Sequence, residues 1–209
     1  MANEASPDLT LFLDILRTLV QIDAPYMVIG AFASTMFGST RTTYDIDMIV
    51  DINWQHVQQL VAAYPPPRFY ADPRQMIESI ALGIMFNIID SSRGLKADLI
   101  PISMEPRYQR AFQNRIRRRL MWPGIEPFDI WCARPEDIIV GKLMAWTEGR
   151  SRKHETDIYE MVAANRWRTS QAQGDPLDIG YIDERAQAMS SETVVLWNAV
   201  KAAVDREFQ

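Results

Sequence analysis

The first apolar residues of the chain recur every three to four positions. They predict an amphipathic helix over about 8–21. Ser6-Pro7-Asp8 supplies a capping hydroxyl and a proline for its first turn. The apolar stripe consists of Leu11, Phe12, Ile15, Leu16 and Leu19.

Shorter apolar runs then alternate with helical patterns. Residues 84–90 and 94–101 read as two strands joined by Ser91-Ser92-Arg93, which predicts a hairpin. Asn53 is a helix cap, and the prolines at 65–67 end the helix that it starts. The other predicted elements up to residue 101 are strands at 25–29 and 43–51 and helices at 31–37, 53–64 and 73–81.

From residue 106 a short helix, 106–113, precedes two β-like runs at 115–122 and 126–133. The pattern then becomes helical: Pro135-Glu136-Asp137 starts one helix, 155–166 forms a second and 190–208 a third. The predicted fold class is therefore α/β, a mixed sheet flanked by helices with a helical carboxy-terminal half. We expect an α/β core over 1–133 and a helical region over 134–209.

Two acidic residues, Asp45 and Asp47, interrupt an apolar run. Residues i and i+2 of a strand share a face, so these two side chains project together. The opposite, buried face would carry Tyr44, Ile46, Met48 and Val50. Neighbouring carboxylates repel each other unless a cation or a proton lies between them. The pair therefore indicates a divalent metal, and with it an enzyme that handles nucleotides.

The bulk composition narrows the class of protein. A hydrophobic fraction of 47% in 209 residues suits a packed core, and one cysteine, Cys132, excludes an intrachain disulfide. The sequence shows neither a membrane span nor a signal peptide, so we expect a cytoplasmic protein. The net charge of −5 argues against binding nucleic acid over the whole surface, but it leaves room for a local basic patch.

Two further features support metal-dependent chemistry. Gly30 follows the first predicted strand, and backbone N–H groups at such a turn can hold a triphosphate. Asp98 lies on the predicted 94–101 strand, on the same face as Lys96. A third carboxylate can bind a second metal and activate an attacking hydroxyl. The cation would be Mg²⁺ or Mn²⁺, the substrate an NTP, and Asp45, Asp47 and Asp98 the metal ligands.

These motifs resemble the nucleotidyltransferase superfamily that includes DNA polymerase beta, and more closely its AbiEii-like branch. That branch carries a Gly-Gly-x-Ala segment followed by Arg-x-Thr-x-Asp-x-Asp. The corresponding segments here are Gly30-Ala31-Phe32-Ala33 and the run from Arg41 through Thr43 and Asp45 to Asp47.

A downstream signature of the branch is also present, as Pro135-Glu136-Asp137, Lys142-Leu143, Ala145, Arg150 and Asp157-Ile158. The resemblance implies that Gly30, Ala31, Arg41, Thr43 and Asp157 bind the nucleotide. It also implies a catalytic role for Lys142, which would neutralise phosphate charge. Two departures stand out: Ala31 replaces a glycine or serine, and His154 occupies a position that is acidic in many members.

Several residues keep a structural alternative. Asp98 could be a strand-face residue paired to Lys96, and Lys142 could extend to the surface along an apolar helix. Arg41 could bind phosphate or pair with acids. Asp157 could anchor Arg150 or Lys153. The arginines at 107, 110, 115 and 117–119 are either an RNA-binding strip or charges that protect an exposed strand.

The resemblance implies transfer of an NMP to a hydroxyl of a tRNA 3′ end or of a protein, as in toxin–antitoxin systems, where an antitoxin is the partner. Antibiotic modification is a further possibility. A nucleotide sensor that keeps the fold without catalysis is the alternative from another class.

Overall fold

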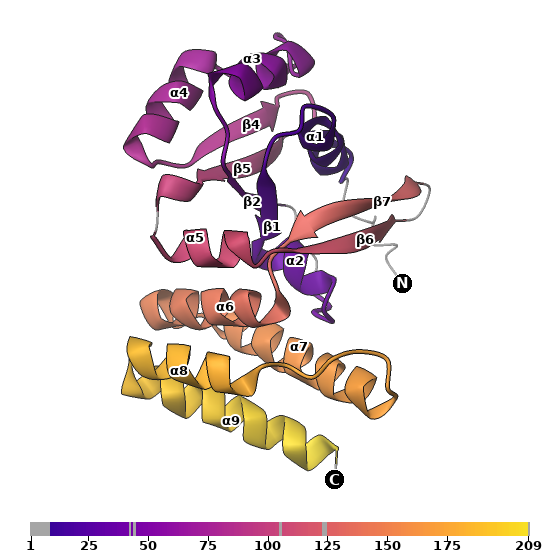
Figure 1. Ribbon diagram of the computed structural model, residues 1–209, viewed down its shortest axis with the longest axis vertical. Helices are drawn as coiled ribbons and strands as arrows, with labels where there is room; N and C mark the ends of the chain where they lie inside the picture. The colour runs from indigo at the N-terminus through magenta and orange to yellow at the C-terminus, as the bar shows by residue number, and fades with distance from the viewer. Residues whose placement is uncertain (1–8, 42, 44, 105, 123–124, 209) are drawn as a thin grey trace. The chain divides into compact units, whose positions relative to one another are not determined.

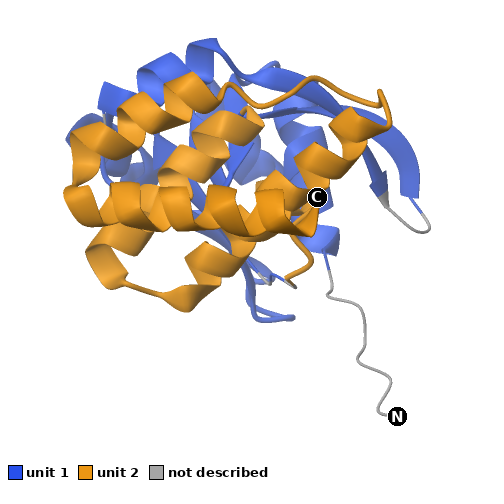
Figure 2. Cartoon of the chain, turned by 90° about the horizontal axis from the view of Figure 1, so that it is seen from below, with its two compact units in different colours: residues 1–32, 42–133 blue, residues 33–41, 134–209 orange. Residues whose placement is uncertain are grey.

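A computed structural model describes residues 9–41, 43, 45–104, 106–122 and 125–208. The chain forms two compact units (Figure 2). Residues 1–32 and 42–133 form the first, and residues 33–41 and 134–209 form the second. Residues 33–41 thus belong to the second unit although they precede most of the first in sequence. The helix-start signal at Ser6-Pro7-Asp8 and the orientation of Tyr44 concern positions outside the described residues.

The first unit contains a seven-stranded mixed sheet in the order β3-β4-β5-β2-β1-β7-β6 (Figure 1). Its strands are β1 (Tyr26–Ile29), β2 (Ile46–Val50), β3 (Phe69–Tyr70), β4 (Phe86–Asp90), β5 (Leu95–Pro101), β6 (Ile116–Trp122) and β7 (Ile125–Cys132). Strand β2 runs antiparallel to β1 and parallel to β5. The central strands are therefore β5, β2 and β1, and two of the predicted site residues, Asp47 and Asp98, lie on them.

Helices complete the first unit: α1 (Thr10–Gln21), α3 (Trp54–Ala63), α4 (Pro73–Leu82), η1 (Ile102–Met104) and α5 (Pro106–Gln113). Helix α2 (Gly30–Thr35) follows β1 directly, and its residues from Ala33 on belong to the second unit. The apolar stripe of α1 is buried, and so are Ile46, Met48 and Val50 of β2, as predicted. Asn53 caps α3 by accepting a hydrogen bond from the His56 N–H, which confirms the predicted start of that helix.

The second unit contains α6 (Pro135–Gly149), α7 (Arg152–Ser170), α8 (Ile179–Met189) and α9 (Ser191–Glu207). Proline at the first position of α6 and acids in its first turn match the predicted helix start. These helices bury apolar side chains that form their own core: Ile139, Leu143, Ile158, Met161, Ile182, Trp197 and Val204.

The predicted fold class is confirmed: a mixed sheet flanked by helices, with a helical carboxy-terminal half. The β4–β5 hairpin and the short helix at 106–113 are confirmed as well. Three elements of the described chain were not predicted: the two-residue strand β3, the short helix η1 and helix α8. A signal for α8 was present, because the side chain of Asp178 caps it by accepting from the Tyr181 N–H. Within the described part of the chain, no helix is long and apolar enough to cross a membrane.

Candidate active site

Two of the predicted acids are neighbours across the centre of the sheet. Strands β2 and β5 are parallel, and their register pairs Asp47 with Asp98. Residues paired in this way point to the same face of a sheet. The two carboxylates therefore share a face, while Met48 and Leu99, paired one position later, form the fully buried opposite face. Asp98 is 7% exposed, and Asp47 is half-buried.

Gly30 lies directly against the Asp47 carboxylate. Its φ of 69° is in the left-handed region, which suits glycine. A Cβ at this position would collide with Oδ2 of Asp47 and lie 3.0 Å from its carboxyl carbon. The absence of a side chain at Gly30 thus makes room for an acid on the adjacent strand β2. Sequence reasoning placed a phosphate at this turn, whereas the contact that Gly30 makes here is with Asp47.

Asp98 has a well-defined set of partners. Lys96 Nζ donates to Oδ2 at 3.1 Å, and Asn87 Nδ2 donates to Oδ1 at 2.5 Å. The hydrogen bond from Lys96 raises the pKa of the lysine, and the charges of Asp98, Asp45 and Asp47 raise it further. Lys96 is therefore the common counter-charge of all three acids, and its side chain is 44% exposed.

Asp45 differs from the other two acids. It is exposed and precedes the first residue of β2, and its backbone is tied to Thr43, whose Oγ1 donates to the Asp45 carbonyl at 3.0 Å. Within the described residues, no group of three or more acidic, histidine or cysteine side chains is placed to hold a metal ion. The three acids therefore form no ready-made metal cluster among the described residues, and the role of Asp45, Asp47 and Asp98 as metal ligands stays a prediction. Asp45 lies outside the strand ladder, and donors from the protein occupy both oxygens of Asp98.

The residues present nevertheless fit a hard divalent cation. Asp47 and Asp98 offer carboxylate oxygens from adjacent strands, and Gly30 leaves space beside one of them. Mg²⁺ is commonly bound through one or two carboxylates, with water and substrate phosphates in its remaining positions. Two carboxylates are thus enough protein ligands for Mg²⁺. Asp98 can serve as one of them once its hydrogen bond with Lys96 is broken.

The second unit holds a different carboxylate cluster, centred on Asp157. This residue has no exposed surface. Lys142 Nζ donates to Oδ2 at 2.5 Å, and Ser39 Oγ donates to Oδ1 at 3.0 Å. The Arg41 guanidinium contacts both oxygens at 3.3 Å. Burial by itself would raise the pKa of Asp157, but the hydrogen bonds and charges of Lys142 and Arg41 outweigh it and hold the pKa below its ordinary value.

The contacts of Asp157 rule out two structural alternatives, a Lys142 that reaches the surface and an ion pair between Asp157 and Arg150. Lys142 is buried beside Asp157 and does not extend to the surface. Arg150 pairs with Glu192 and not with Asp157. His154 lies in the same electrostatic environment. Burial lowers its pKa, the positive charges of Lys142 and Lys153 lower it further, and Asp157 partly opposes them.

Sequence reasoning missed Asn87 and Ser39. Asn87 could have been found: a hairpin centred between Ser92 and Arg93 pairs position 87 with position 98, which is the observed register. Ser39 reaches Asp157, 118 residues away in sequence, and no local pattern indicates such a contact.

Comparisons with known proteins give structural matches only. No family model matches the chain, and no curated protein sequence matches it. The fold is similar to the solution structure of the antibiotic-resistance factor ANT(2'')-Ia, with 15% identity, 96% of each chain covered and a TM-score of 0.49. An antigenic nucleotidyltransferase-like protein from Paracoccidioides brasiliensis has 16% identity over 89% of this chain and 92% of its own, with a TM-score of 0.48.

A CCA-adding enzyme in complex with CTP is also similar, with 11% identity over 96% of this chain and 52% of that enzyme, and a TM-score of 0.36. These structural neighbours are nucleotidyltransferases or nucleotidyltransferase-like proteins, at a low level of likeness.

Proposed function

We propose that the chain is a metal-dependent nucleotidyltransferase that moves an NMP from an NTP to an acceptor hydroxyl. The observation that carries the proposal is the pairing of Asp47 with Asp98 across two central parallel strands, with Gly30 against the Asp47 carboxylate. Repulsion makes two like charges on neighbouring strands costly unless a cation lies between them. The arrangement is therefore suited to binding Mg²⁺ or Mn²⁺ with a substrate phosphate.

In the proposed reaction, the acceptor oxygen forms a bond to the α-phosphorus, and the bond from that phosphorus to the bridging oxygen breaks. Pyrophosphate leaves, and Asp98 is the group proposed to take the proton of the acceptor hydroxyl. A bound divalent ion would supply Lewis-acid stabilisation of charge on the phosphate oxygens. Asp47 and Asp98 would hold that ion, and Asp45, whose charge acts on Lys96, would add negative charge.

Lys96 has a defined part in this proposal. It neutralises the acids when no metal is bound, through its hydrogen bond to Asp98. Its ammonium is partly exposed and sits at the end of a flexible chain, so it can leave Asp98 and contact a phosphate when a divalent ion takes its place. Binding of the metal would then replace the Lys96 ammonium with a divalent ion at the Asp98 carboxylate.

The other predicted roles stay predictions. Ala31 and Thr43 as nucleotide-binding residues depend on where the phosphates bind. Arg41, Lys142 and Asp157 are bound to each other within the second unit. Asp157 orients the two cations, and the nucleotide-binding role that the resemblance implies for the three residues stays a proposal. An acceptor on a tRNA 3′ end or a protein, a toxin role with an antitoxin, and antibiotic modification are the acceptor hypotheses that follow from the resemblance.

A nucleotide sensor is the second candidate, because protein donors already occupy both oxygens of Asp98. The test is incubation with each labelled NTP, Mg²⁺ or Mn²⁺, and either bulk RNA or cell lysate. Asp47→Asn should abolish transfer of label. Asp51→Asn, which removes an exposed acid just beyond β2, is the matched control and should retain it. Binding of an NTP with no transfer to any acceptor would favour the sensor.

A further inference from the structure

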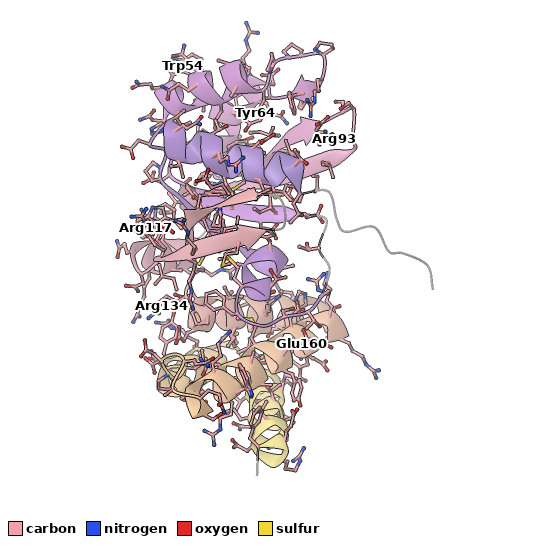
Figure 3. The ribbon with its side chains drawn as sticks, turned by 90° about the vertical axis from the view of Figure 1, so that its right-hand side faces the viewer. Trp54, Tyr64, Arg93, Arg117, Arg134 and Glu160 are labelled. Atoms are coloured by element: carbon pink, nitrogen blue, oxygen red, sulfur yellow. The ribbon has the colours of Figure 1, made fainter. Side chains whose placement is uncertain are left out.

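Helix α9 lies along the outside of the second unit and has two different sides (Figure 1, Figure 3). Its buried side packs against the other helices of that unit and consists of Thr193, Trp197, Val200 and Val204. The opposite side is exposed, and its residues follow alternate steps of three and four, the spacing of one face of a helix. We name this exposed face the α9 stripe, and its residues are Glu192, Val195, Ala199, Ala202 and Arg206.

The middle of the α9 stripe is apolar although it faces water. Val195 is 69% exposed, and Ala199 and Ala202 continue the apolar surface along the helix. A mostly apolar groove of about 460 Å³ borders the amino-terminal half of the stripe, where Trp146 and Arg150 form its other wall. Single exposed apolar residues are ordinary, whereas a continuous apolar strip beside a groove marks a docking surface.

Side-chain size and charge change along the α9 stripe. Val195 lies near its amino-terminal end, and Ala199 and Ala202 lie farther along, so the apolar side chains become smaller. Glu192 begins the stripe and Arg206 ends it, so the charge changes sign between the two ends. A stripe with this order is complementary to a second copy of itself that runs in the opposite direction.

We propose that two copies of the chain form a dimer in which their α9 helices pack antiparallel, with the two-fold axis at Ala199. Glu192 and Arg206 are each seven residues from Ala199. In this arrangement Glu192 therefore meets Arg206 of the partner subunit, and the symmetry repeats that ion pair on the other side of the axis. Val195 lies against Ala202 of the partner subunit, so a larger side chain packs against a smaller one.

The alanines allow the two helices to pack closely. Helix axes in contact are separated by about 8–10 Å, and small residues at the contact favour the shorter distance. The carboxy-terminal half of the partner's α9 then covers the apolar groove beside Trp146. The α9 stripe is about 21 Å long from Glu192 to Arg206. A contact of this length is at the small end of specific interfaces, so we expect a reversible dimer with a micromolar dissociation constant.

Other arrangements fit the α9 stripe less well. A parallel pair of α9 helices would bring two Glu192 carboxylates together at one end and two Arg206 guanidinium groups together at the other, and like charges repel. An unrelated partner protein could cover the apolar residues, but its binding would not require the two ends of the stripe to match each other. The order of charges along α9 therefore favours a second copy of this chain.

Sedimentation equilibrium over a range of protein concentrations measures the dissociation constant of the dimer. Ala199→Glu should weaken the dimer at least about hundredfold, because two carboxylates would meet at the axis within an apolar contact. The matched control is Gln187→Glu, which adds the same charge at an exposed position of α8 and should leave the dissociation constant unchanged. A native chain that is monomeric at every concentration would overturn the proposal, and so would equal dissociation constants for the native chain and Ala199→Glu.

A charge-swap experiment tests the antiparallel direction. Glu192→Arg and Arg206→Glu should each weaken self-association about tenfold, because each variant places like charges at both ends of the contact. An equal mixture of the two variants should form a mixed dimer with near-native affinity, since each of its contacts joins an arginine to a glutamate. Glu192→Arg also loses the native contact with Arg150, but it does so alone and in the mixture, so the comparison is unaffected.

Native mass spectrometry identifies the mixed dimer, because the two variants differ in mass. A mixture that associates no more strongly than either variant alone would overturn the antiparallel arrangement. Neither experiment uses a nucleotide, so the dimer is tested independently of the proposed transfer reaction.

Discussion

Asp98 in the first unit and Asp157 in the second are both buried carboxylates bound to a lysine, but their surroundings differ. The lysine of Asp98 is 44% exposed, and the other donor to this carboxylate is the neutral amide of Asn87. The lysine of Asp157 is 6% exposed, and an arginine and a serine complete the set. The difference shows that a buried carboxylate can bind a metal ion only where the lysine that is paired with it can move away.

The electrostatic surroundings differ in sign as well. Three acids surround Lys96 and raise its pKa, whereas burial and neighbouring cations lower the pKa of His154 beside Asp157. The first cluster has an excess of negative charge that a divalent cation can satisfy. The second cluster is already neutralised by its own arginine and lysine. We therefore expect substitutions in the sheet to affect metal binding and substitutions around Asp157 to affect stability.

The largest stability effect should come from Asp157→Ala. Removal of this carboxylate breaks the buried ion pair with Lys142, and breaking a buried ion pair by removing one partner costs about 3–5 kcal/mol. Urea unfolding followed by circular dichroism measures the change. Asp205→Ala, at an exposed position of α9, should change the free energy of unfolding by less than about 0.5 kcal/mol. Similar urea midpoints for the two variants would contradict the stabilising role that we assign to the Asp157 cluster.

Gly30→Ala should have an intermediate effect. Its φ of 69° disfavours any other residue, and the new Cβ would meet the Asp47 carboxylate. We expect a loss of about 1–2 kcal/mol in the free energy of unfolding and loss of Mn²⁺ binding, because Asp47 must rotate away. Gly94→Ala also introduces a Cβ at positive φ, but into open space, and is the control for backbone strain. If both variants bound Mn²⁺ normally, Gly30 would not shape the site.

Lys96→Met should increase affinity for the metal. The ammonium competes with a divalent ion for Asp98, and a partly exposed pair contributes at most about 1 kcal/mol. Binding of Mn²⁺ measured by calorimetry should therefore tighten by about threefold to fivefold. Lys153→Met removes an exposed lysine of α7 and should have no effect. Weaker binding in Lys96→Met would mean that the lysine supports the metal and does not compete with it.

The smallest effect should be a dependence of stability on pH that comes from His154. Its folded pKa lies below the unfolded value of 6.5, because of burial and the charges of Lys142 and Lys153. As the pH falls, the unfolded chain therefore binds a proton at His154 before the folded chain does. The stability that neutral His154 contributes is complete above pH 6.5 and is lost as the pH falls toward the folded pKa. Thermal unfolding should show a steeper loss of stability below pH 6.5 in the native chain than in His154→Gln. Parallel profiles would contradict this assignment.

The sequence predicted the local parts of both regions well. The i and i+2 spacing of Lys96 and Asp98 and the hairpin turn at 91–93 are short-range features, and both are present in the structure. The burial of Ile46, Met48 and Val50 followed from the alternation that made Asp47 a candidate. Such features depend on the period of one strand, which the chain encodes over a few residues.

What could not be predicted depends on contacts between distant segments. The sequence grouped Asp47 with Asp98 in one site, but not the register that pairs them, because that register requires β2 and β5 to be neighbours although β3 and β4 lie between them in sequence. Asp157 likewise meets Ser39 and Arg41 across more than a hundred residues. The departure of Asp45 from the expected position arose because β2 begins at Ile46, and strand ends depend on tertiary pairing.

Mn²⁺ binding tests the central claim most directly, because the cation can be counted by electron paramagnetic resonance whether or not an acceptor is known. The native chain should bind Mn²⁺, and Asp47→Asn should weaken that binding at least about tenfold. Arg41→Gln, which removes a partner of Asp157 in the other cluster, should leave the affinity unchanged. Equal Mn²⁺ binding by the native chain and by Asp47→Asn would contradict the account, because the paired acids of β2 and β5 would then not be the cation site.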